Sequence, residues 1–251
     1  MRKAILMLLG IYFVAGIVCA QTESPRDILI KRITEKFQDV KEMSAVVEMN
    51  MSMMGVNMKM PVKMWMKGNL IRMDSSMSIP GTDKNMEQIT VSDGKTISIY
   101  NSLNNTVMVI DLNKLPEDMR KMVMNQTGQH MGFDPEVFNK IKDLLKVEEK
   151  TRNNRKIYFI TADNVDAIRA SLKMPPAASQ IPFKKLIYMI DYETLFPIRV
   201  EVYTESETPG MWMDFIEMKI SGVPDAVFNV KFPENANKID ITDSVKSSLS
   251  K

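Results

Sequence analysis

The stretch AVVEMNMSMMGVNMKMPVKMWMK, residues 45–67, decides the fold. From Val47 onward, apolar residues, most of them methionine, stand at every second position with polar or smaller residues between them. Alternation with a period of two is typical of a β-strand that has one apolar face. The segment Met54-Gly55-Val56-Asn57 interrupts the alternation with residues that favour a turn. The stretch therefore predicts a long β-hairpin whose two strands share an apolar face.

Strand, turn and helix signals continue on both sides of this hairpin. Asp93-Gly94 and Asn104-Asn105 are typical of tight hairpin turns. Ser24 and Pro25 are suited to start a helix, and the residues that follow carry an apolar stripe at helical spacing. Helices are predicted over 25–42, 114–125, 135–146 and 163–172, and further strands over 70–75, 87–92, 96–100, 107–111, 147–150, 156–161, 184–191, 197–204, 211–221, 227–232 and 238–241. This order predicts an α+β fold, with one strongly curved antiparallel β-sheet and helices on its apolar concave side.

The first twenty residues have the three parts of a secretory signal peptide. Arg2 and Lys3 supply positive charge, and the apolar run that follows to Val18 carries no charge. Val18-Cys19-Ala20 suits cleavage after Ala20. The apolar run is shorter than the roughly twenty residues that span a bilayer, which favours cleavage over a retained anchor.

These signals predict three parts of the chain: a cleaved signal peptide over 1–20, a single domain over 21–242, and a polar C-terminal tail over 243–251. The protein is expected to be periplasmic or secreted. A lipid anchor on Cys19 is the alternative. Cys19 is the only cysteine, so the domain is expected to have no disulfide and no thiol chemistry.

Charge and composition exclude several classes of function. The chain has 33 basic and 31 acidic residues, and the excess of two is accounted for by Arg2 and Lys3 of the signal. No net positive charge remains to neutralise phosphates, so no nucleic-acid partner is expected. His130 is the only histidine and lies between glycines in a predicted loop, which leaves no zinc site with several nitrogen or sulfur ligands. We expect a protein that is not an enzyme and has no cofactor.

Methionine is the unusual feature of the sequence. The chain has 24 methionines, concentrated between Met43 and Met77. Their side chains are flexible and polarisable, so a surface lined with them adapts to irregular apolar partners. Three interpretations remain open: a core in which methionine replaces leucine, an open apolar cavity for acyl chains, and a soft-metal site, since thioethers select Cu(I). The ligands in the third case would be Met49, Met51, Met53, Met58 and Met60.

Several segments, taken in order, resemble one known superfamily. They are WMKGNLIRM from Trp65 to Met73, VSDGKT from Val91 with Tyr100 after it, IDYETLFP from Ile190 to Pro197, and the closing segments 223–228 and 232–233. Their order is similar to that of the outer-membrane lipoprotein carrier and sorting proteins, the LolA-like superfamily. The likeness covers most of residues 25–242.

The resemblance implies an incomplete β-barrel around an apolar cavity. It also implies a non-catalytic function in outer-membrane lipoprotein sorting, in which acyl chains of lipoproteins or lipids are carried between membrane-bound donor and acceptor proteins. Arg72 matches the strand arginine that the family associates with lid contacts and ligand transfer. The residues expected to line the cavity are Val47, Met49, Met51, Met60, Met64, Trp65, Ile99, Tyr100 and Tyr188. A second hypothesis is a structural or regulatory envelope module that uses the same fold to bind a protein partner.

Overall fold

The computed structural model describes residues 23–53, 56–79, 81–126, 135–171 and 183–249. The predicted signal peptide, with Cys19, and the loop that contains His130 lie outside the described residues. The described strands are β1 (Glu42–Met53), β2 (Val56–Lys67), β3 (Leu70–Ser78), β4 (Asn85–Ser92), β5 (Thr96–Asn101), β6 (Thr106–Asp111), β7 (Lys146–Arg152), β8 (Arg155–Ala162), β9 (Lys185–Asp191), β10 (Pro197–Tyr203), β11 (Met211–Lys219) and β12 (Asn237–Asp240). The described helices are α1 (Pro25–Phe37), α2 (Glu117–Gln126), α3 (Pro135–Ile141), α4 (Val165–Ser171) and α5 (Thr242–Leu249).

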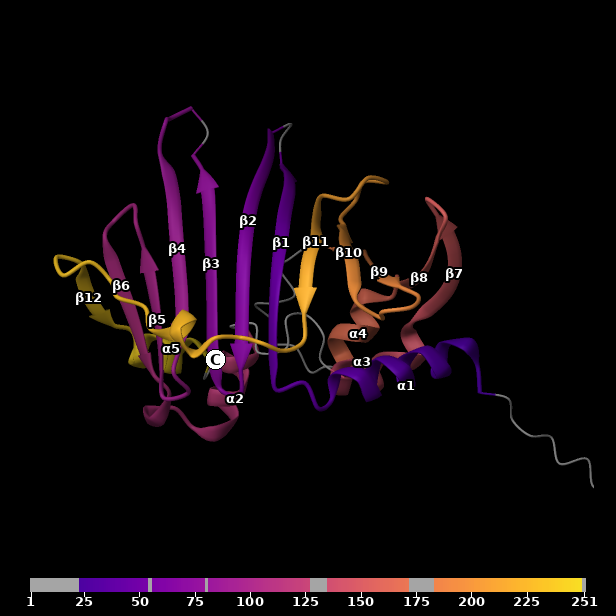
Figure 1. The fold of residues 1–251 in the computed structure, drawn as a ribbon, viewed down its shortest axis with the longest axis horizontal. Coiled ribbons are helices and arrows are strands. Elements are labelled where there is room, and N and C mark those ends of the chain that lie inside the picture. Colours follow the sequence, from indigo (N-terminus) through magenta and orange to yellow (C-terminus); the bar gives the residue numbers. More distant parts are fainter. Residues whose placement is uncertain (1–22, 54–55, 80, 127–134, 172–182, 250–251) are drawn as a thin grey trace, which may run out of the picture.

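All twelve of these strands belong to one sheet, in the spatial order β12-β6-β5-β4-β3-β2-β1-β11-β10-β9-β8-β7 (Figure 1). Strands β7 and β12 are its two edges, so the sheet curves without closing into a barrel. Strands β1 and β11 pair in the middle and join the two halves of the chain. Neighbouring strands are antiparallel except β12, which runs parallel to β6. The predicted α+β fold with a curved, mainly antiparallel sheet is confirmed.

The central hairpin forms as predicted, but its turn is tighter than the expected 54–57, because β2 already begins at Val56. Met43 of β1 lies opposite Met66 of β2, and the pairing continues without a shift to Met53 and Val56. Val47 therefore lies opposite Val62, and both side chains are 3% exposed. We call the face that carries Val47 and Val62 the inner face, and the face that carries the alternate residues the outer face.

Helices cover part of the inner face. Leu29, Ile30, Ile33 and Phe37 of α1 are buried in the same cluster as Val47 and other residues of β1, β2, β8 and β9. Helix α3 joins this cluster, and α2 packs in a second cluster against residues of β3, β5 and β6. The core thus lies between the concave side of the sheet and the helices, as predicted.

Helix α1 starts as predicted and ends early. Ser24 caps it, because its side-chain oxygen accepts a hydrogen bond from the backbone amide of Asp27 at 3.1 Å. The helix ends at Phe37 instead of residue 42, because β1 already begins at Glu42 and the chain needs a connection between the two elements. Val40, in this connection, packs against the core without being helical.

The segment between β11 and β12, residues 222–236, crosses the outer face, and we call it the strap (Figure 1). A strand was expected over 227–232, and this prediction is wrong. The chain forms a short 3₁₀ helix at Asp225–Phe228 and then runs without pairing in the sheet until β12. Pro224 and Pro233 flank the segment and have no amide hydrogen to contribute to a strand ladder.

Most of the polar tail expected over 243–251 belongs to helix α5. Val245 and Leu249 of α5 stand four residues apart and pack against the second core cluster, which stabilises the helix. Asp240 precedes the helix and accepts a hydrogen bond from the backbone amide of Thr242 at 2.9 Å. Hydrogen bonds from Thr242, followed by the contact with Lys114, lower the pKa of Asp240 to about 2. Among the helices that the structure describes, none is long and apolar enough to cross a membrane.

Candidate functional site

Methionines stand opposite one another on neighbouring strands of the inner face. Met49 of β1 lies opposite Met60 of β2 on one side and Met213 of β11 on the other. Met51 lies in the same way between Met58 and Met211. Side chains at directly opposite positions of an antiparallel pair are about 5 Å apart at their Cβ atoms and pack together. Two rows of thioethers therefore run across the three central strands β2, β1 and β11.

A pocket opens where these rows lie. Its volume is about 40 Å³, and its lining is almost entirely apolar. Asn50 also contributes, but its side-chain amide is engaged with the Glu48 carbonyl oxygen and with Asp214. The six methionines that line the pocket are each partly exposed: Met49, Met51, Met58, Met60, Met77 and Met211.

Of the nine residues predicted to line a cavity, three line this pocket: Met49, Met51 and Met60. Val47 lies deeper in the core, and Met64 packs against that core without lining the pocket. The alternation of the hairpin also contained the signal for Met58, which the prediction left out. Met77 and Met211 come from β3 and β11, and only the strand order brings them to the site.

Two predicted residues, Trp65 and Tyr100, lie on the outer face. Each directly follows a residue of the inner face, Met64 and Ile99 respectively, and neighbours in a strand point to opposite sides. Ile99 itself packs against the second core cluster, away from the methionine pocket. The structure therefore does not bring these three residues to the same cavity as the methionines.

Tyr188 extends the inner face beyond the methionines. The row that contains Met49 and Met213 continues through Val200 of β10 to Tyr188 of β9, each directly opposite the next. The ring of Phe138 from α3 stands edge-on to the Tyr188 ring, with centroids 5.6 Å apart. Burial raises the pKa of Tyr188 to about 12, so its hydroxyl stays neutral at physiological pH. The row of uncharged side chains thus continues from the pocket to α3, with Val200 buried between them.

Arg72, the residue expected to contact a lid, lies on the outer face and holds the strap. Its guanidinium forms two hydrogen bonds with the Asp74 carboxylate, at 2.8 and 2.6 Å, and donates a third to the Val227 carbonyl oxygen at 2.6 Å. It also lies 5.4 Å from the centre of the Trp65 ring. Tyr100 contacts the strap as well, because the centroids of its ring and of the Phe232 ring lie 5.9 Å apart.

Replacing Arg72 with methionine is expected to loosen the strap. The change removes the charge-assisted bond to Val227 and leaves Asp74 without its cation, a loss of roughly 1.5 kcal/mol, or about tenfold in a local opening equilibrium. Amide hydrogen exchange over 225–228 should therefore accelerate by about tenfold. Lys95→Met, an exposed change of the same kind in the turn between β4 and β5, is the control. Exchange rates equal to those of the unchanged protein would show that Arg72 does not hold the strap.

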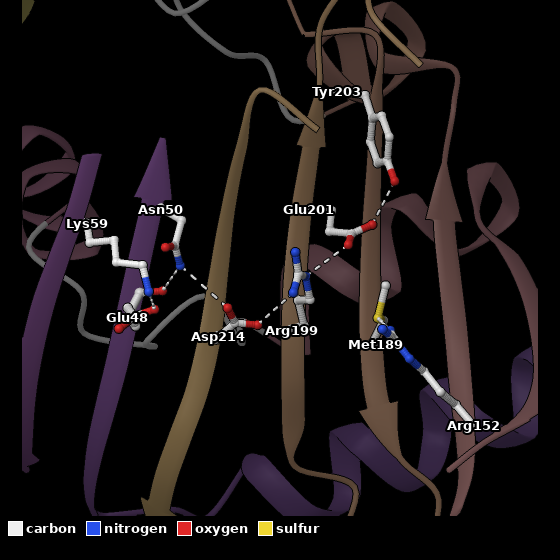
Figure 2. Close-up of polar contacts among 9 residues, drawn as sticks. All are labelled: Glu48, Asn50, Lys59, Arg152, Met189, Arg199, Glu201, Tyr203 and Asp214. Atoms are coloured by element: carbon white, nitrogen blue, oxygen red, sulfur yellow. Dashed lines mark hydrogen bonds and ion pairs between the residues drawn. The ribbon is translucent and has the colours of Figure 1, made fainter. Parts of the chain in front are cut away.

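The rest of the outer face carries paired charges across β1, β11 and β10. Figure 2 shows the chain of contacts from Asn50 through Asp214 and Arg199 to Glu201. Arg199 Nη1 donates to Asp214 at 3.1 Å, and its Nε lies 2.9 Å from Glu201, although not aligned as a hydrogen bond. Tyr203 donates to Glu201 at 2.7 Å, and burial together with this bond raises the pKa of Tyr203 to about 12. This part of the outer face thus carries ion pairs and hydrogen bonds, whereas the inner face carries uncharged thioethers.

The described part of the chain contains no cluster of three or more His, Cys, Asp or Glu side chains that could hold a metal ion. The pocket on the inner face is uncharged and lined mainly by methionine side chains.

No protein-family model matches the sequence, and no curated protein matches it. Solved structures show partial likeness. An uncharacterized conserved protein from Thermus thermophilus is 12% identical with a TM-score of 0.49, and the match covers 85% of this chain and 97% of that one. A domain from Vibrio parahaemolyticus, described as an outer membrane lipoprotein-sorting protein domain, is 10% identical with a TM-score of 0.37. The match covers 80% of this chain and 95% of that one. A chain of the Pseudomonas aeruginosa MucA/MucB complex is 13% identical with a TM-score of 0.42, covering 82% and 61%.

The Vibrio parahaemolyticus structure is described as a lipoprotein-sorting domain, the kind of protein that the sequence resembles. Identities of 8–13% and TM-scores below 0.5 assign neither a family nor an activity to this chain.

Proposed function

We propose that this protein is a non-catalytic carrier that binds the acyl chains of lipoproteins or lipids on the inner face of its sheet, in the periplasm. One observation carries the proposal: an uncharged pocket on the concave face, lined by six partly exposed methionines and backed by the core. The signal peptide predicted over 1–20 supports the location outside the cytoplasm.

The pocket is smaller than an acyl chain. Its volume of about 40 Å³ admits only a small group while the methionines hold their present positions. Each methionine side chain has three rotatable bonds, so the pocket can widen by rotamer changes while the strands stay in place. The apolar row through Val200 and Tyr188 is the direction in which a longer chain would extend.

Burial of hydrocarbon would supply the affinity. Each CH₂ group removed from water contributes about 0.8 kcal/mol, so a run of about ten would contribute roughly 8 kcal/mol before the losses on association. If none of this free energy were lost on association, the Kd would be about 1 μM. Tighter binding would require that more of the hydrocarbon chain is enclosed. A carrier that must release its cargo is well served by binding of this strength.

The direct test is native mass spectrometry of the protein purified from its envelope fraction without detergent, followed by titration of the delipidated protein with a fluorescent fatty acid. The expected result is a co-purified mass with a hydrocarbon chain, and saturable binding of the probe after the mass is removed. A protein that carries no such mass and ignores the probe would overturn the proposal and favour an envelope module that binds a protein partner.

A further inference from the structure

The pocket on the inner face is also a concentrated set of soft donor atoms. We propose that Met51, together with its two direct cross-strand neighbours Met58 and Met211, binds one monovalent soft cation, Cu(I), for which Ag(I) is a close analogue. This function is separate from acyl-chain binding and does not rest on it.

The first support is the geometry of the sheet. Met51 in β1 is paired at once with Met58 of β2 and Met211 of β11, so three thioethers come from adjacent positions on three hydrogen-bonded strands. Their Cβ atoms are spaced by roughly 5 Å along the row, and methionine is long and flexible enough for the three sulfurs to converge. Met49 and Met60 form the next row and line the same pocket.

The second support is the chemistry of the lining. Thioether sulfur is a soft, neutral ligand that selects Cu(I), whereas Ca²⁺ and Mg²⁺ require oxygen ligands. The pocket surface is almost entirely apolar, and no carboxylate or imidazole is among its lining residues. Such a donor set discriminates against the hard divalent cations, because it has no charged oxygen with which to replace their water.

The third support is access. Met51, Met58 and Met211 are each partly exposed and line one pocket, so solvent reaches all three residues without unfolding of the sheet. The backbone beneath them is fixed by the two strand ladders of β1, and only side-chain rotation is needed to close around an ion.

The donor type gives the site a diagnostic property. Cysteine, histidine and carboxylate ligands must lose a proton before they bind a metal, so their metal affinity falls as the pH is lowered. A thioether carries no proton to lose. The affinity of a site built from Met51, Met58 and Met211 should therefore be the same at pH 5 and pH 8.

The experiment titrates the full mature chain with Ag(I), and anaerobically with Cu(I) against a colorimetric Cu(I) chelator, at pH 5 and pH 8. We expect one ion per chain and an affinity unchanged between the two pH values. Met51→Leu and Met211→Leu should each weaken binding by at least tenfold, because leucine fills the space without a sulfur. Met64→Leu, on the same face but outside the pocket, should bind as the unchanged protein does.

Three outcomes would overturn the metal site: no uptake of either ion, equal uptake by Met51→Leu, or an affinity that falls by tenfold or more at pH 5. The fatty-acid titration on Met51→Leu separates this proposal from the carrier function. Leucine keeps the lining apolar, so acyl-chain binding should persist in the variant that has lost the ion. Each proposal can therefore fail without the other.

Discussion

Met60→Glu is expected to lower the affinity for a fluorescent fatty acid at least tenfold. Met60 lines the pocket from β2 and also packs against the main core cluster. A carboxylate at this position must lose part of its hydration when a hydrocarbon chain enters, and an uncompensated loss of this kind costs several kcal/mol. The measurement is a probe titration at neutral pH, with circular dichroism to verify that the sheet is intact.

Asn57→Glu is the matched control for this variant. It adds the same charge to the same strand, at an exposed position on the outer face. Probe binding should remain within about twofold of the unchanged protein. If both glutamate variants bind equally well, the hydrocarbon does not lie against the methionine pocket, and the inner-face carrier hypothesis fails for this site.

Ile33→Ala is expected to have the largest effect on stability. Ile33 is 0% exposed and lies at the centre of the α1 contact with the sheet. Truncation of a fully buried isoleucine to alanine usually costs about 2–5 kcal/mol, because the surrounding core closes only partly around the lost volume. Chemical denaturation followed by tryptophan fluorescence measures the difference in the free energy of unfolding.

Ile28 supplies the control on the same helix. Its side chain is 46% exposed, so Ile28→Ala removes the same atoms from a site that is largely in water. We expect a change below about 1 kcal/mol. Similar losses from the two variants would mean that α1 does not cover the inner face as the structure has it.

The central hairpin was predictable because its signal is local. The alternation of methionine with polar residues from Val47 to Met66 specifies the strands and divides their side chains into two alternating sets. The capping of α1 by Ser24 was predictable for the same reason, since a cap depends on residues three positions apart.

The composition of the pocket depends on contacts that no local pattern contains. Met211 reaches the site only because β11 pairs with β1, across more than half of the chain. Whether Met64 or Trp65 points to the inner face likewise depends on which of the two alternating sets of β2 faces the helices. The strap was misread as a strand because it is held on the outer face through the Val227 carbonyl oxygen and the Phe232 ring without joining the ladder.

The pairing of β1 with β11 and of β12 with β6 has a consequence for how the chain reaches its native state. The first six strands lie next to one another in sequence order and can associate as soon as they are made, whereas β1 must wait for β11, and the β6 edge for residues 237–240. Contacts between such distant segments slow folding, because a long loop of chain must be ordered before they form. Completion of the twelve-stranded sheet therefore depends on pairing between segments that are far apart in the sequence, whereas the hairpins between consecutive strands can form earlier.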